Sequence, residues 1–120
     1  MESGRRAVVP SMKGAGDLIR EAVTGWPGVE ATPHRFGGIE YSYGRKELGH
    51  VHGDRLADLP MPRRIRDQLV AEGRAQPHHV LPETGWVSCW ISGPEDAERV
   101  IQLFRMQYER YTESRGRSTS

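Results

Sequence analysis

The sequence predicts an α+β domain: an antiparallel sheet of about four to five strands with two to three helices packed on one face. Three observations lead to this prediction. Short alternating segments broken by glycine and proline fill residues 29–59, helical periodicities stand on both sides of them, and 120 residues suffice for one hydrophobic core. Since consecutive strands joined by short turns pair antiparallel, the helices cover one sheet face and leave the other to be covered or used.

The N-terminal half begins with a helix and continues as a meander. The helix is expected over residues 17–26, where apolar residues recur at helical spacing: Leu18, Ile19, Val23 and Trp26. Residues 29–59 are typical of three or four strands, with Asp58, Leu59 and Pro60 interpreted as a turn. Alternation along the strands places Ile39, Tyr41 and Tyr43 on one face, and it places Leu48, His50 and His52 on one face of the next strand.

The C-terminal half is predicted to be helix, strand, helix. Ile65, Leu69 and Val70 define a helix that ends at Gly73, and residues 86–91 are aromatic and apolar enough for a strand. Pro94 starts the last helix, whose apolar face continues to Tyr111. One domain is therefore expected over residues 13–111, with flexible tails at residues 1–12 and 112–120.

Composition excludes several classes of function. The net charge is +1, so the chain creates no long-range field of the kind that attracts nucleic acid or a membrane surface. Cys89 has no second cysteine with which to form a disulfide, and nowhere do about 18 apolar residues follow one another. We expect a cytoplasmic protein that binds a small molecule. Whether the uncovered sheet face forms a homodimer is left open.

Four of the five histidines stand in two short clusters, His50 with His52 and His78 with His79. Side chains two residues apart on an extended strand project from the same face, so His50 and His52 indicate one site. Three imidazoles, those of His50, His52 and His78, match a zinc site with water in the fourth position. Two histidines together with Glu47 would instead match the facial triad of non-haem iron oxygenases.

A metal-free site is equally compatible with these residues. Imidazoles titrate near neutral pH, so a group of them can move protons for a phenolic or enolic substrate. On a regular strand Arg45 and Glu47 lie on the face opposite His50, and a bulge at Gly49 would turn them toward it. Trp86 opens a strand, where a large aromatic residue more often belongs to the core, although it could also cover an aromatic-binding pocket. His34 is interpreted as a surface residue.

Several motifs together resemble the luciferase-domain family, whose characterised members are the fungal luciferases. They are the Glu-x-x-His-x-His segment at residues 46–52, the segment from Gly73 through Gln76 to His78, Trp86 at a strand start, and the helix start at residues 94–100. The resemblance covers a little over half of the chain and identifies it as similar to small bacterial members. Fungal members add molecular oxygen to a hydroxylated styrylpyrone, release carbon dioxide and light, and are not known to need a metal or flavin.

The resemblance implies which residues form the site. Glu47, His50, His52 and His78 would be the catalytic group, with His50 or His52 removing the proton of an enolic substrate. The substrate ring would contact the side chains of Tyr43, Arg45 and Trp86. The activity implied is that of a monooxygenase-like oxidoreductase with molecular oxygen as co-substrate and no other cofactor. The alternative is a non-catalytic module that binds a ligand or holds zinc or iron at His50, His52 and His78.

Overall fold

The computed structural model describes residues 13–34 and 37–119, with side chains described up to Glu113. The N-terminal tail expected over residues 1–12 lies outside the described residues. The elements follow in the order α2 (Ala15–Val23), β1 (Val29–Pro33), β2 (Ile39–Tyr43), β3 (Lys46–His52), β4 (Leu56–Pro60), α3 (Arg63–Ala71), β5 (Gln76–Pro77), β6 (Trp86–Trp90), η2 (Pro94–Asp96) and α4 (Ala97–Thr119).

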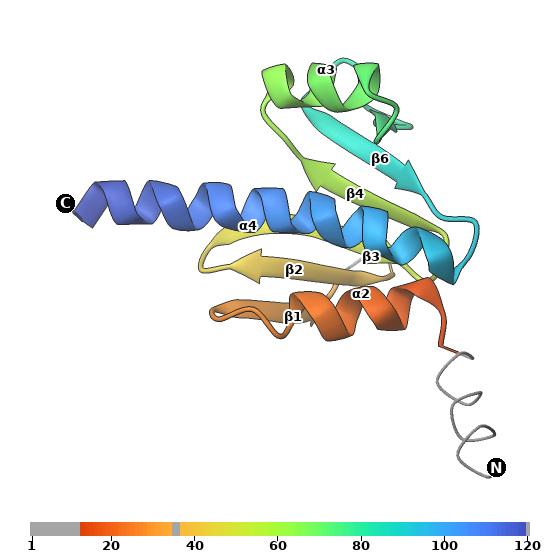
Figure 1. Cartoon of the computed structure of the whole chain (residues 1–120), viewed down its shortest axis with the longest axis horizontal. Coiled ribbons are helices and arrows are strands. Elements are labelled where there is room, and N and C mark those ends of the chain that lie inside the picture. Colours follow the sequence, from red (N-terminus) through yellow and green to blue (C-terminus); the bar gives the residue numbers. More distant parts are fainter. Residues whose placement is uncertain (1–12, 35–36, 120) are drawn as a thin grey trace, which may run out of the picture.

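The strands form one six-stranded sheet in the order β1-β2-β3-β4-β6-β5, and neighbouring strands are antiparallel throughout. Helices α2 and α4 lie side by side across one face of this sheet, while α3 packs at its β5–β6 end (Figure 1). The predicted α+β class is therefore confirmed, with a slightly higher strand count. The additional strand, β5, has only two residues, too short for any periodicity in the sequence to reveal it.

The hydrophobic core lies between the sheet and the two covering helices. Helix α2 contributes Ile19 and Val23, and α4 contributes Leu103 and Phe104, all fully buried. The sheet presents its own apolar residues to them: Tyr41, Leu48, Val51, Ala57, Leu59, Val87 and Cys89. As predicted, Tyr41 and Tyr43 share a face; the Tyr41 ring lies 5.6 Å from that of Phe104. The opposite sheet face therefore holds the residues that alternate with these.

A β-bulge interrupts the pairing of β2 with β3. Tyr41 lies opposite Gly49 and Ser42 lies opposite Glu47, so Leu48 is the extra residue. Leu48 consequently turns into the core, where it is fully buried, and the expected common face of Leu48 and His50 is wrong. The bulge leaves no room for a side chain at Gly49. A Cβ there would stand 3.0 Å from the Phe104 ring and 2.7 Å from the Asp58 carbonyl oxygen, so only glycine fits.

One other boundary differs from the predictions. Asp58 and its neighbours are not a turn; they continue β4, because both β3 and β6 pair with this segment through backbone hydrogen bonds.

Helix α4 runs to Thr119, past Tyr111, the last residue of its predicted apolar face. Once a helix has formed, each further residue adds one backbone hydrogen bond, so the helix can outlast its apolar face.

Candidate functional site

The sheet face that α2 and α4 leave free carries a cluster of polar side chains. His50 and His52 project from β3, and Asp58 of β4 is the direct cross-strand partner of His50. On the other side of Asp58, its partner on β6 is Ser88. Three neighbouring strands thus bring these side chains together, since directly opposed residues of an antiparallel pair share a face.

Asp58 is the centre of the cluster. It is only 1 % exposed, and Ser88 Oγ donates a hydrogen bond to its Oδ1 atom at 2.7 Å. Its other oxygen, Oδ2, faces the Nε2 atoms of four imidazoles at 3.4 to 3.8 Å: His50, His52, His78 and His79. Burial alone would raise the pKa of Asp58, but the hydrogen bonds from His50 and Ser88 outweigh it and lower this pKa to about 2. Asp58 is therefore ionised.

His50 lies between two carboxylates. Its Nδ1 atom donates to Glu47 Oε2 at 2.8 Å, and its Nε2 atom faces Asp58 Oδ2 at 3.4 Å. Burial lowers the pKa of His50, but the hydrogen bonds with Asp58 and Glu47 more than compensate and raise it to about 9. The bulge predicted at Gly49 explains the contact, because it turns Glu47 to the His50 face.

His52 and His78 differ from His50 in protonation. Burial, and then the charge of His50, lower the pKa of His52. Burial likewise lowers the pKa of His78, whose Nδ1 atom accepts the backbone N–H groups of Val80 and Leu81 at 3.1 and 3.0 Å. That nitrogen carries no proton, so the proton of the neutral His78 ring is on Nε2 and points toward Asp58.

Aromatic rings complete the cluster. His34 stacks on His50 with ring centroids 4.2 Å apart, although its isolated place in the sequence is typical of a surface residue. It joins the cluster because the turn between β1 and β2 returns the chain beside β3, with His34 N–H donating to the Gly38 carbonyl oxygen. The Trp86 ring lies 5.5 Å from that of His50 and 5.8 Å from that of His78, so Trp86 belongs to the cluster.

A cavity of about 400 Å³ opens beside the histidines. It is lined by His34, His50, His78, Val80, Leu81 and Trp86. Val80 and Leu81 are 67 % and 47 % exposed, so its outer wall is apolar and open to solvent. The volume lies in the range of about 300–1,000 Å³ typical of small-molecule sites, and an apolar wall facing a few polar groups is their usual composition. Arg66 of α3 fastens the loop that forms this wall, since its guanidinium donates to the Pro82 carbonyl oxygen.

Two of the predicted site residues lie elsewhere. The Tyr43 ring packs 5.4 Å from that of Tyr108 of α4, on the helix-covered face of the sheet. Arg45 is exposed in the β2–β3 turn, where it lines a different cavity together with Tyr43 and Tyr111. The bulge at Gly49 reorients Glu47 only, because Arg45 lies beyond the strand.

Sequence reasoning missed four members of the cluster: Asp58, Ser88, His34 and His79. The signal for Asp58 was available: an acidic residue inside an alternating segment, one short turn after a His-x-His strand, is placed to face that strand. His79 donates from Nε2 to Asp58 at 3.4 Å and stacks on His78, whereas the family resemblance points to His78 alone.

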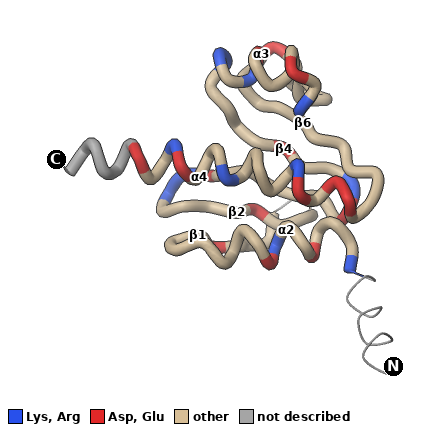
Figure 2. Tube along the Cα trace, in the orientation of Figure 1, with Lys and Arg blue, Asp and Glu red and all other residues tan. Residues whose placement is uncertain are grey.

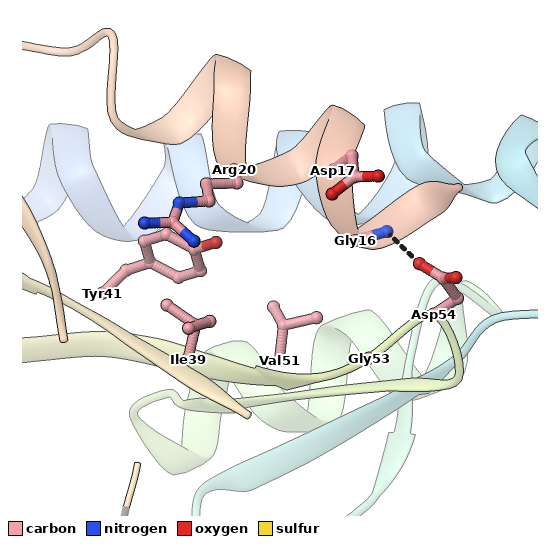
Figure 3. A pocket seen from close by; sticks show the side chains of 8 residues that line it. All are labelled: Gly16, Asp17, Arg20, Ile39, Tyr41, Val51, Gly53 and Asp54. Atoms are coloured by element: carbon pink, nitrogen blue, oxygen red, sulfur yellow. Dashed lines mark hydrogen bonds between the residues drawn. The ribbon is translucent and has the colours of Figure 1, made fainter. Parts of the chain in front are cut away.

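Two other cavities among the described residues have fewer side chains that could take part in a reaction. Figure 3 shows one of about 140 Å³ between α2 and the sheet, where Asp54 already accepts the Gly16 N–H at 2.8 Å. Another is lined by Cys89 and Arg99, whose guanidinium donates to the buried thiol at 2.8 Å. Burial raises the pKa of Cys89, so the thiol is protonated and a poor nucleophile.

Charged positions of both signs are distributed over the two helices that cover the sheet. Acidic and basic positions alternate along α4 and around α2 (Figure 2), and Arg105 pairs with Glu109 at 3.0 Å. Within the described ranges, no helix combines the length and the apolar character needed to cross a bilayer.

Two overlapping groups in the cluster have the composition of a metal site. One consists of His50, His52 and Asp58, the other of Asp58, His78 and His79, and in each group the ligand atoms lie within 4.8 Å of one another. The site can therefore exchange protons, bind a cation and hold an apolar ligand beside both.

Comparison with known proteins gives one family. The model of the luciferase domain matches residues 45–107, a stretch that runs from the β2–β3 turn into α4 and includes Glu47, His50, His52, Asp58, His78 and Trp86. The comparisons with curated proteins and with solved structures gave no match. Because the family model covers more than half of the chain, the protein belongs to the luciferase-domain family.

Proposed function

We propose that the protein is a small-molecule oxidoreductase that oxidises an aromatic or enolic compound with molecular oxygen at the histidine cluster. The observation that carries this proposal is the apolar cavity of about 400 Å³ that shares His50 and His78 with the cluster. A flat ring in this cavity would contact Trp86, and its hydroxyl would reach the imidazoles. Family membership supports the same type of activity.

The first step is removal of the hydroxyl proton. His52 suits this task better than His50, since both nitrogens of His50 already face carboxylates. Proton transfer from the enol to His52 leaves an electron-rich anion and an imidazolium near the ionised Asp58. The carbon of the anion then adds to molecular oxygen: one carbon–oxygen bond forms, the O–O double bond becomes a single bond, and the outer oxygen of the resulting peroxide takes the proton from His52. His78, with its proton on Nε2, is the hydrogen-bond donor of the site.

Oxygen uptake tests this function. Purified untagged protein is incubated with 4-hydroxy-2-pyrones bearing aromatic groups, simple phenols and catechols, and dissolved oxygen is followed with an electrode. We expect uptake with an aryl hydroxypyrone, and a loss of about 10²–10⁴-fold in kcat on His52→Asn, the range that general base catalysis contributes. Trp86→Ala should raise KM because it removes a wall of the cavity.

The matched control is Arg64→Ala, which changes an exposed side chain of α3 remote from the cavity lining. It should leave oxygen uptake unchanged. The proposal is wrong if the protein, with or without added metal ions, consumes no oxygen with any compound of the panel.

A non-catalytic binding module is the second candidate. The observation in its favour is the presence of two His/Asp groups that could hold a metal ion. Such a module would bind zinc or iron, or retain a ligand in the cavity, and leave the oxygen concentration unchanged. The oxygen electrode therefore separates the two functions. A homodimer is a further prediction, for which the mass in solution by light scattering is the measurement.

A further inference from the structure

We propose that His50, His52 and Asp58 form a binding site for a divalent first-row transition-metal ion. Their ligand atoms lie within 4.8 Å of one another, and Asp58 is buried. Two imidazoles and one carboxylate can hold Fe²⁺, Mn²⁺ or Zn²⁺ and leave coordination positions open for other molecules. The inference deepens the proposed function and rests on it for what would occupy those positions. In the metal-loaded protein His52 would be a ligand and not the base, and a substrate hydroxyl bound at an open position would lose its proton to solvent.

Rigid elements hold the three donors. His50 and Asp58 are direct cross-strand partners of β3 and β4, and His52 lies two residues further along the same face. Ser88 holds Asp58 Oδ1 at 2.7 Å, which leaves Oδ2 directed at both imidazoles. A site built on paired strands is more precise than one built on loops, because backbone hydrogen bonds fix the spacing of its ligands.

Glu47 has the position of an outer partner for such a site. It accepts the Nδ1–H of His50 at 2.8 Å, which leaves Nε2 of that ring for an ion. Metal-binding histidines commonly donate their second ring N–H to a carboxylate, which orients the ring and makes it a stronger ligand. The carboxylate of the facial triad expected from the sequence is thus Asp58. Glu47 would not touch the ion; it would hold the ring of His50.

The second group, Asp58 with His78 and His79, is a weaker candidate for the same ion. Nδ1 of His78 accepts two backbone N–H groups and carries no proton, so binding through Nε2 would require the doubly deprotonated ring. Without His78 this group retains two donors, too few for the usual three or four protein ligands. His78 is therefore not a metal ligand, in contrast to the set expected from the sequence.

Cobalt binding tests the site. Protein is treated with a chelator, dialysed, and titrated with Co²⁺, whose visible absorption reports nitrogen and oxygen coordination, and then with Zn²⁺ in competition. We expect saturation at one Co²⁺ per chain, displacement by Zn²⁺, and loss of the absorption band in His52→Asn and Asp58→Asn. Glu47→Gln should weaken Co²⁺ binding about 10–100-fold, as outer partners usually do.

His78→Asn is the matched control, because an Asn side-chain oxygen can still accept the two backbone N–H groups while the Nε2 atom is removed. It should bind Co²⁺ like the unaltered protein. Circular dichroism of each variant establishes that it is folded. The inference is wrong if folded, unaltered protein shows no saturable Co²⁺ band, or if His78→Asn abolishes the band as His52→Asn does.

The outcomes separate this inference from the proposed function. Oxygen uptake by chelated protein that binds no Co²⁺ would overturn the metal site and support the proposed oxygen-dependent oxidation. Saturable Co²⁺ binding without oxygen uptake by the Fe²⁺-loaded or Zn²⁺-loaded protein would support the site and overturn the proposed oxidation.

Discussion

Ser88 Oγ donates to Asp58 Oδ1 at 2.7 Å, and this hydrogen bond fixes the orientation of the Asp58 carboxylate. Asp58 is the only buried carboxylate among the described residues. Both residues are almost fully buried, and they are cross-strand partners on β4 and β6. With Oδ1 held by Ser88, Oδ2 lies between the imidazoles. Ser88 therefore organises the site although it lies outside the cavity lining.

Replacing Ser88 with alanine should destabilise the fold and disturb Asp58. The variant leaves a buried carboxylate oxygen without its donor, at a cost of about 1–3 kcal/mol in the free energy of unfolding. Because the Ser88 bond helps to keep the pKa of Asp58 low, that pKa should rise. Urea denaturation at neutral pH measures the first effect, with Ser42→Ala as the serine control. Equal stability of Ser88→Ala and unaltered protein would contradict the role of this bond.

Replacing Glu47 with glutamine should lower the pKa of His50 in chelator-treated protein. The folded-state pKa of His50, about 9, lies above its ordinary value of 6.5, so its ion pairs stabilise the fold fully below pH 6.5. This stabilisation is lost as the pH rises from 6.5 through 9. In Glu47→Gln the loss should still begin near pH 6.5, because the unfolded chain sets that limit, but it should end at lower pH, as followed by imidazole NMR and by denaturation at several pH values. An unchanged His50 titration would show that Glu47 is not its partner.

Replacing Gly38 with alanine should disturb His52. Gly38 has φ +87°, and a Cβ there would meet the Val51 carbonyl oxygen at 2.4 Å and His52 Nδ1 at 3.2 Å. Gly37, with φ +88° and nothing within 4 Å of its Cβ position, is a matched control for backbone strain alone. Each variant should lose about 1–3 kcal/mol of unfolding free energy from the backbone conformation.

Only Gly38→Ala should also weaken Co²⁺ binding, because only there does the new methyl group press on the strand that carries His52. Isothermal titration of both variants measures this difference. Equal Co²⁺ affinity in Gly37→Ala and Gly38→Ala would refute the proposed link between this glycine and His52.

Replacing Gln107 with methionine should loosen the bulge that places Glu47. The fully buried Gln107 amide donates to the Pro60 carbonyl oxygen at 2.7 Å and to the Leu48 carbonyl oxygen at 3.4 Å. Tyr111 donates to the Glu47 carbonyl oxygen at 3.0 Å. Without the amide, buried carbonyl groups lose their donor, which costs about 1–3 kcal/mol. The exposed Gln68→Met is the control.

The same variant should alter the His50 ring. If α4 fixes the bulge, the Nδ1 resonance of His50 in Gln107→Met moves toward that in Glu47→Gln, whereas Tyr111→Phe produces a smaller change. If the His50 spectrum of Gln107→Met is identical to that of unaltered protein, then the hydrogen bonds from α4 do not hold the bulge in place.

Features that depend on neighbouring residues could be predicted from the sequence, whereas features that depend on contacts between distant residues could not. The α+β class and the shared face of Tyr41 and Tyr43 follow from local periodicity, which is why they were predicted correctly. Leu48 was assigned to the wrong face because strict alternation fails at a bulge, although Gly49 marked its position. The two-residue β5 forms only because β6 offers it a partner, a long-range contact without a local pattern.

The site was predicted in part for the same reason. His50 and His52 share a face by strand geometry, and Glu47 joins them through the bulge. Asp58 resembled a turn residue because Pro60 follows it closely, yet pairing on both sides keeps it in a strand. His34 stacks on His50 only because two strands fold back on each other. The cytoplasmic location and the extent of the single domain stay predictions.

The central claim is that the imidazoles and the apolar cavity form one ligand-binding site. Nitrogen-15 NMR of the histidine side chains during titration with an aryl hydroxypyrone tests it most directly. The account predicts that the resonances of His50, His52 and His78 shift together, along one binding curve that Trp86→Ala weakens. Resonances that ignore the ligand, or that respond at unrelated concentrations, would contradict it.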